Sequence, residues 1–92
     1  MNNKAELIQQ LEAIADEYKN LQNARKELLG FGRTDKRHVV EKAKMIDERL
    51  KNLKVQWLKT IAEIDPAYEE IFKRTAPSKK SIIAIKQMIG LE

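Results

Sequence analysis

Apolar residues recur at alternating steps of three and four along residues 3–29. The seam positions are Leu7, Leu11, Ile14, Tyr18, Leu21 and Leu28, with Arg25 as the one polar exception. A repeat of 3.5 residues aligns side chains in a narrow stripe, which is the pattern of a coiled coil. Asn2 or Asn3 can cap the start, and Gly30 occupies the place where a left-handed residue commonly ends a helix. We therefore predict a first helix over residues 3–29.

The same repeat resumes over residues 35–64. Its seam positions are Val39, Ala43, Ile46, Leu50, Leu53, Trp57, Thr60 and Ile64. Thr34 is a suitable N-cap, and Asp35 would lie in the first turn, where the helix dipole favours negative charge. We predict a second helix over residues 35–64, so each long helix would measure about 40–45 Å.

A short third helix is predicted directly after the second. Asp65 is a capping residue, and Pro66 is favoured at the first helical position. The predicted range is 66–75, because the segment TAPS then breaks the pattern.

A fourth helix is predicted over residues 79–89. Ser78 or Ser81 can cap its start, and Gly90 lies where it would end.

The short connection between the two long helices predicts that they run antiparallel. Their seams then pair residues whose numbers sum to about 64. The expected pairs are Leu21 with Ala43, Tyr18 with Ile46, Ile14 with Leu50, Leu11 with Leu53, and Leu7 with Trp57. The predicted fold is therefore all-α: a long antiparallel, coiled-coil-like helical hairpin, followed by two short helices packing on its open end. Residues 1–92 form a single helical domain.

Apolar residues extend beyond the seam at the open end of the hairpin, namely Ile8, Val55, Leu58, Ile61 and Ala62. They need a cover, so we expect the short helices to pack over the Trp57 end. The rest of the hairpin receives no such cover, and small domains bury little surface. Partly exposed apolar residues would remain there, namely Ala13, Ala15, Ala24, Leu29, Val40 and Met45. We predict a two-fold homodimer that uses Ala15, Leu29, Val40 and Met45.

Composition narrows the classes of function. Hydrophobic residues make up 42% and charged residues 35% of the chain, as in a folded, well-solvated domain. Cysteine is absent, which removes disulfides, iron–sulfur clusters and cysteine nucleophiles and fits a reducing cytoplasm. The first residues lack the apolar core of a signal peptide, and the longest apolar run has four residues. We expect a cytoplasmic protein without membrane association.

Residue types that form active sites are scarce. His38 is the only histidine, and the two serines, Ser78 and Ser81, lie in no nucleophile motif. The GFG of residues 30–32 has no preceding strand and no third glycine, so it is a poor phosphate loop. We expect no enzyme activity, no metal, no cofactor and no small-molecule substrate.

The connection LLGFGRTDKRHVV contains more than a turn requires. A turn needs glycine and a capping residue, but it needs neither an aromatic residue nor several basic ones. We predict that the tip binds a partner through Phe31, Arg33, Lys36, Arg37 and His38. His38 also fits an ordinary exposed residue in the first turn of the second helix.

Net charge is +4, and the positive excess lies beyond Gly30. Lys44, Lys51 and Lys54 fall near one face of the second helix, which is a candidate surface for anions or nucleic acid. The last two predicted helices also have a helix-turn-helix layout, with Lys79 and Lys80 opening the second of them. Interleaved acidic residues, and a last helix rich in isoleucine, count against this interpretation.

These features favour a small non-enzymatic helical protein that binds or oligomerises with another protein. Chains of this size and style are common among bacterial and phage regulators, inhibitors and assembly factors. The alternative is a basic nucleic-acid-binding regulator that uses the tip and second helix, or the C-terminal helix pair.

Overall fold

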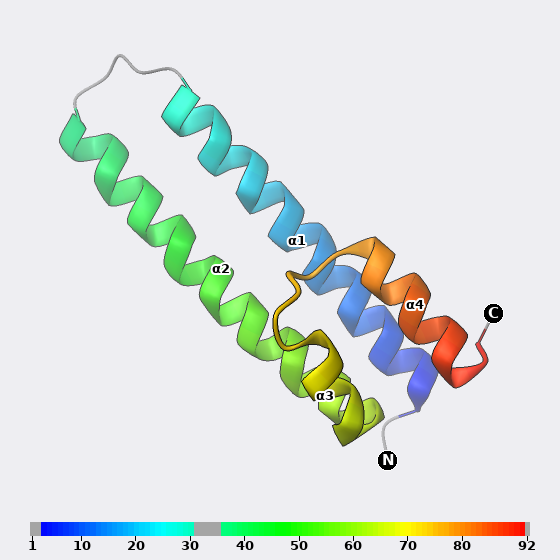
Figure 1. Cartoon of the computed structure of the whole chain (residues 1–92). Helices are drawn as coiled ribbons and strands as arrows, with labels where there is room; N and C mark the ends of the chain where they lie inside the picture. Colours follow the sequence, from blue (N-terminus) through cyan, green and yellow to red (C-terminus); the bar gives the residue numbers. More distant parts are fainter. Residues whose placement is uncertain (1–2, 31–35, 92) are drawn as a thin grey trace.

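The chain folds as a long helical hairpin with two short helices at its open end (Figure 1). The computed structural model describes residues 3–30 and 36–91. Its helices are α1 (Lys4–Gly30), α2 (Lys36–Ile64), α3 (Pro66–Phe72) and α4 (Lys79–Ile89). Strands are absent from the described residues, and the molecule is elongated, with extents of 49 × 21 × 19 Å. The predicted all-α architecture is confirmed.

Three helix starts are capped by side chains that the sequence indicates. The capping oxygens lie 2.7, 2.9 and 3.2 Å from the amide nitrogens that donate to them, in the pairs Asn3–Ala5, Asp65–Ala67 and Ser78–Ser81. Each bond satisfies a backbone N–H that has no partner within its helix, which typically contributes about 1 kcal/mol. Thr34, the predicted cap of α2, lies outside the described residues.

Two glycines were predicted to end helices, and only one of them adopts the left-handed conformation. Gly90 has φ 75°, and its N–H and that of Leu91 both donate to the carbonyl of Lys86. Gly30 instead is the last helical residue of α1, and its φ is not positive. The left-handed prediction at Gly30 is wrong because glycine permits that conformation without requiring it, and here the helix continues through the residue.

The third helix is shorter than predicted, ending at Phe72 rather than at residue 75. Both the backbone N–H and the hydroxyl of Thr75 donate to the carbonyl of Phe72, at 3.1 and 2.9 Å. These bonds span three residues, so they close a tight turn instead of extending the helix.

The core lies at the open end of the hairpin, where all four helices meet around Trp57. Trp57 is completely buried. Buried apolar residues from every helix form the same cluster, namely Ile8, Leu11, Ile14, Ala15, Leu53, Ile61, Phe72, Ile82 and Ile85. A fully buried side chain of this kind contributes about 1.5–3 kcal/mol. Because α3 packs against α2 and α4 against α1, the predicted cover over the Trp57 end is confirmed.

Two predictions about exposure are wrong. Val55 was expected under the cover but stays 46% exposed, whereas Leu58 and Ala62, about one and two turns nearer the open end, are half-buried. Ala15 was expected to be partly exposed but belongs to the core. It is buried because α4 packs onto α1 there, so Ala15 is unavailable for self-association.

The hairpin seam is tightly packed at its open end and loosely packed toward the tip. Leu7, Leu11, Leu53 and Trp57 are fully buried. Nearer the tip, Ala43 is still buried, but the other seam residues are half-buried, namely Tyr18, Leu21, Leu28, Val39, Ile46 and Leu50. Only two helices run through that part of the molecule (Figure 1). We call it the tip half: residues 17–30 of α1 and 36–54 of α2.

Candidate interaction surface

The predicted contact residues of the loop fall mostly outside the described part of the chain. Phe31 and Arg33 belong to residues 31–35, and Lys36 is described only as the first residue of α2. Arg37 and His38 are exposed in the first turn of α2. Contact through these loop residues therefore stays a prediction.

A second stripe with steps of three and four runs along α1 beside the seam. Its first members, Ile8, Glu12 and Ala15, lie beneath α4, with Lys86 Nζ 3.5 Å from Glu12 Oε1. The stripe continues toward the tip as exposed residues, namely Lys19, Gln22, Lys26 and Leu29. The stripe that receives α4 therefore extends along the tip half without a cover.

A comparable stripe runs along α2. Leu58 and Ile61 lie at its open end and pack in or against the core. Toward the tip it continues as Lys54, Lys51, Asp47, Lys44 and Val40. Lys54 is half-buried and the other four are exposed.

Two shallow hollows lie on this face, one between the two stripes and one between the α1 stripe and the start of α4. The first has a volume of about 580 Å³ and is lined by Gln22, Arg25, Lys26, Leu29, Gly30, Asp47 and Leu50. The second has a volume of about 300 Å³ and is lined by Ala15, Asp16, Lys19, Gln22, Pro77, Ser78 and Lys79. Since Gln22 borders both, together they form a groove that runs from the start of α4 to Gly30. We use the name basic groove for this groove together with the stripe residues of the tip half that lie along its sides.

Positive charge is concentrated along the basic groove. Five lysines lie on its sides, namely Lys19, Lys26, Lys44, Lys51 and Lys54. Among the described residues, none of these five forms an ion pair. The one carboxylate of the tip half within the groove, Asp47, is already paired with Arg25, whose Nε lies 2.7 Å from Asp47 Oδ1.

The opposite face of the tip half is electrically balanced. Glu17 and Glu27 carry negative charge there, and Lys42 and Arg49 carry positive charge. Arg49 Nε donates to Glu17 Oε2 at 2.7 Å, and this hydrogen bond and the charge of Glu17 raise the pKa of Arg49. The net charge of the chain does not reveal this difference between the two faces, because the difference arises from how α1 and α2 pack together.

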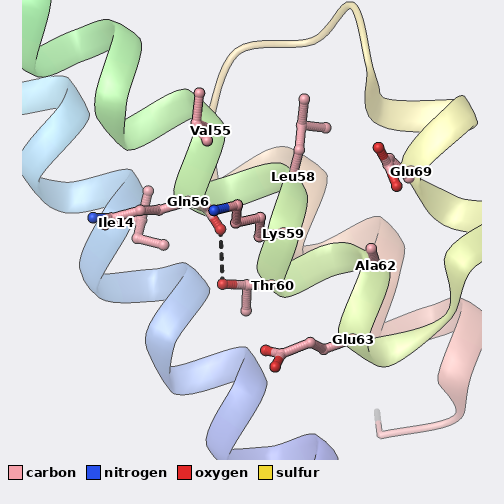
Figure 2. Close-up of a pocket in the computed structure, with 9 residues that line it drawn as sticks. All are labelled: Ile14, Val55, Gln56, Leu58, Lys59, Thr60, Ala62, Glu63 and Glu69. Carbon is pink, nitrogen blue, oxygen red and sulfur yellow. Dashed lines mark hydrogen bonds between the residues drawn. The ribbon is translucent and has the colours of Figure 1, made fainter.

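A further groove of about 810 Å³ follows the surface of α2 near α3 (Figure 2). Figure 2 shows Leu58 and Glu69 on its α3 side and Glu63 on the side toward α1. Thr60 donates its hydroxyl to the carbonyl of Gln56 at 2.8 Å, so its polar atom is satisfied within the helix. The lining mixes aliphatic side chains with both signs of charge, which indicates an ordinary shallow surface.

The C-terminal helices do not form the predicted helix-turn-helix arrangement. α4 packs on α1 and α3 on α2, and the first helix of the pair, α3, has only seven residues. Ile82 and Ile85 of α4 are buried, and Lys79 Nζ lies 3.7 Å from Asp16 Oδ1. Lys80 is exposed. The side of α4 that holds Ile82 and Ile85 therefore belongs to the core, whereas Ile83 is 48% exposed.

Arg25 and Glu17 form ion pairs on opposite faces of the hairpin. Arg25 pairs with Asp47, and Glu17 pairs with Arg49 on the other face of the hairpin. Within residues 3–30 and 36–91, no three acidic, histidine or cysteine side chains are placed to hold a metal ion. In the same residues, no helix is long and apolar enough to cross a membrane.

Comparisons with protein-family models, curated proteins and solved structures found no match for this chain.

Sequence reasoning missed Lys19 and Lys26 as site residues. Lys44, Lys51 and Lys54 stood out because they share one face of a single helix, whereas their counterparts on α1 are separated from them in the sequence. The available signal was the second four-and-three stripe on α1, which begins with apolar Ile8 and changes to lysine beyond Ala15.

Proposed function

We propose that this chain is a small non-enzymatic helical interaction protein that binds another protein through the tip half of its hairpin. The observation that supports this most is the uncovered tip half, where a half-buried seam lies beneath an open groove. Leu29 and Val40 are 45% and 51% exposed on that side. Exposed apolar side chains rimmed by charge are typical of protein interaction sites.

A regulator, inhibitor or assembly factor acting in the cytoplasm is the form of this function that we favour. The absence of cysteine fits that compartment, and a rigid helical hairpin offers a preformed surface for a partner. The exposed first turn of α2, with Arg37 and His38, adjoins the tip half, so the predicted contact through the loop would extend the same surface.

The test is affinity capture from host lysate with the immobilised chain, performed with and without nuclease. We expect a defined protein to be retained in both arms, and to be lost when Leu29 and Val40 are both changed to aspartate. A matched variant changes two exposed residues of the opposite face, Asn20 and Asn52, to aspartate. Retention of no protein beyond that held by an unrelated helical control would contradict the proposal.

The alternative function is binding of nucleic acid, which the five lysines of the basic groove favour. Phosphate contacts release counterions, so such binding would weaken steeply as salt rises. A partner retained only without nuclease, together with oligonucleotide binding that is lost at high salt, would support this alternative.

A further inference from the structure

We propose that the basic groove is a docking site for an acidic amphipathic helix of a partner protein. This inference rests on the proposed function and specifies the chemistry of the partner. The groove has three features that such a ligand requires: a helix-compatible stripe, a partly apolar floor, and unpaired positive charge on both sides.

The helix-compatible stripe is demonstrated by the chain's own α4. α4 lies on the α1 stripe at Ile8, Glu12 and Ala15, and it runs antiparallel to α1, because Lys79 is beside Asp16 and Lys86 beside Glu12. The stripe then continues uncovered from Lys19 to Leu29. Ten residue steps at 1.5 Å correspond to about 15 Å, which is the length of about three helical turns.

The floor of the groove is partly apolar, with leucine side chains beside the Arg25–Asp47 ion pair. Leu29 and half-buried Leu50 line the larger hollow, and Val40 lies on the adjoining stripe of α2. A helix with leucines at heptad positions could bury these side chains as α4 buries Ile8 and Ala15. A nucleic-acid backbone offers no comparable apolar surface, so this floor favours a protein helix.

The charges on the two sides oppose one another in pairs. The two ion pairs across the hairpin, Arg25–Asp47 and Glu17–Arg49, join residues whose numbers sum to 72 and 66. Lys26 and Lys44 sum to 70, and so do Lys19 and Lys51; these sums lie between those of the two ion pairs, so each pair of lysines faces across the groove at about the same height.

Like charges across a groove repel, and acidic side chains between them relieve the repulsion. Lys19 and Lys26 are seven residues apart on α1, and Lys44 and Lys51 are seven apart on α2. Seven residues span about 10.5 Å of a helix, so glutamates at one heptad spacing on a docked helix would meet both pairs. Asp47 is already neutralised by Arg25 and does not compete with the ligand. Glu41 and Glu48 point to the outer side of α2, away from α1.

The test uses a defined peptide and the full chain. The probe is a fluorescein-labelled peptide of three heptads, about 21 residues, with leucine at positions a and d and glutamate at e and g. Glutamate at those positions also opposes pairing of the peptide with itself. Two control peptides replace every e and g glutamate by lysine, or every leucine by serine. Binding is followed by fluorescence anisotropy at low and physiological salt.

We expect the leucine–glutamate peptide to bind and both control peptides to bind at least about ten-fold more weakly. Changing Lys26→Glu and Lys44→Glu together should weaken binding about ten-fold or more. The matched variant, Lys42→Glu with Lys59→Glu, makes the same change in net charge away from the groove and should alter affinity less than about two-fold. Circular dichroism checks that all variants retain their helicity.

Three results would overturn the inference. The first is that Lys26→Glu with Lys44→Glu weakens peptide binding no more than the matched variant does. The second is that the chain binds a duplex or single-stranded oligonucleotide through the groove and does not bind the peptide. The third is a change of sedimentation mass caused by Lys26→Glu with Lys44→Glu, which would identify a second copy as the occupant. If lysate capture retains a partner that the Lys26→Glu, Lys44→Glu variant binds as well as the unmodified chain does, the inference fails while the proposed function stands.

Discussion

Arg25 of α1 and Asp47 of α2 form a two-point ion pair across the hairpin, with Arg25 Nε 2.7 Å from Asp47 Oδ1 and Nη2 3.4 Å from Oδ2. Arg25 occupies the one seam position of α1 that lacks an apolar side chain. The interruption of the repeat is therefore a cross-helix contact and not a break in the helix. This contact also occupies the only carboxylate of the tip half in the groove, leaving the lysines around it as net positive charge.

The substitution Arg25→Leu should raise the free energy of unfolding of the chain by about 1 kcal/mol. The ion pair is about half exposed, so it contributes only about 0.2–1 kcal/mol, whereas a leucine would complete the apolar seam. Thermal unfolding followed by circular dichroism measures the change. Arg49→Leu is the matched control, because Arg49 is also ion-paired but lies outside the seam, and it should bring no gain. A loss of stability in Arg25→Leu would show that the pair contributes more than the seam.

Alanine should have opposite effects at two glycines. Gly30 is helical, and a Cβ added there meets nothing within 4 Å, so Gly30→Ala should stabilise the chain by about 0.5–1 kcal/mol. Gly90 has φ 75°, so Gly90→Ala should destabilise it by about 1–2 kcal/mol. Urea unfolding of both variants checks the pair. Destabilisation by Gly30→Ala would mean that Gly30 adopts a left-handed conformation after all.

Trp57→Phe should cost less stability than the size of the residue suggests. Trp57 is fully buried, and its indole Nε1 has no hydrogen-bond partner among the described residues. An unsatisfied buried donor costs about 1–3 kcal/mol, and phenylalanine removes it. We expect Trp57→Phe to cost under about 2 kcal/mol, and Trp57→Ala about 3–5 kcal/mol because it leaves a cavity. Urea unfolding followed by circular dichroism compares them, and equal losses would contradict this account.

The fold was largely predictable from the sequence because its main signals are local. The seam repeat placed both long helices, and Asn3, Asp65 and Ser78 act as caps where capping residues were expected. These signals depend on residues a few positions apart, so they can be recognised in the sequence without knowledge of the tertiary structure. The end of α3 was less predictable because it depends on one local turn, in which the backbone N–H and the hydroxyl of Thr75 both donate to the carbonyl of Phe72.

The candidate site was only partly predictable because it depends on which face of the hairpin the short helices cover. The sequence indicated that α3 and α4 would pack at the Trp57 end, but not that α4 would bury Ala15. Until that face is known, Lys19 and Lys26 are ordinary solvent-exposed lysines. Packing of α4 identifies their stripe as the one that receives a helix.

Self-association, which stays a prediction, should involve the face opposite the basic groove. Ala15 is buried, and a two-fold contact through Leu29 and Val40 would bring two lysine-rich grooves together. Met45 is 71% exposed on the balanced face. We expect sedimentation at tens of micromolar to give twice the 10.7 kDa chain mass, and Met45→Glu to restore the single mass. Leu29→Glu is the matched control and should leave the dimer intact. A single species of 10.7 kDa for the unmodified chain would contradict self-association, without bearing on the binding of a partner helix.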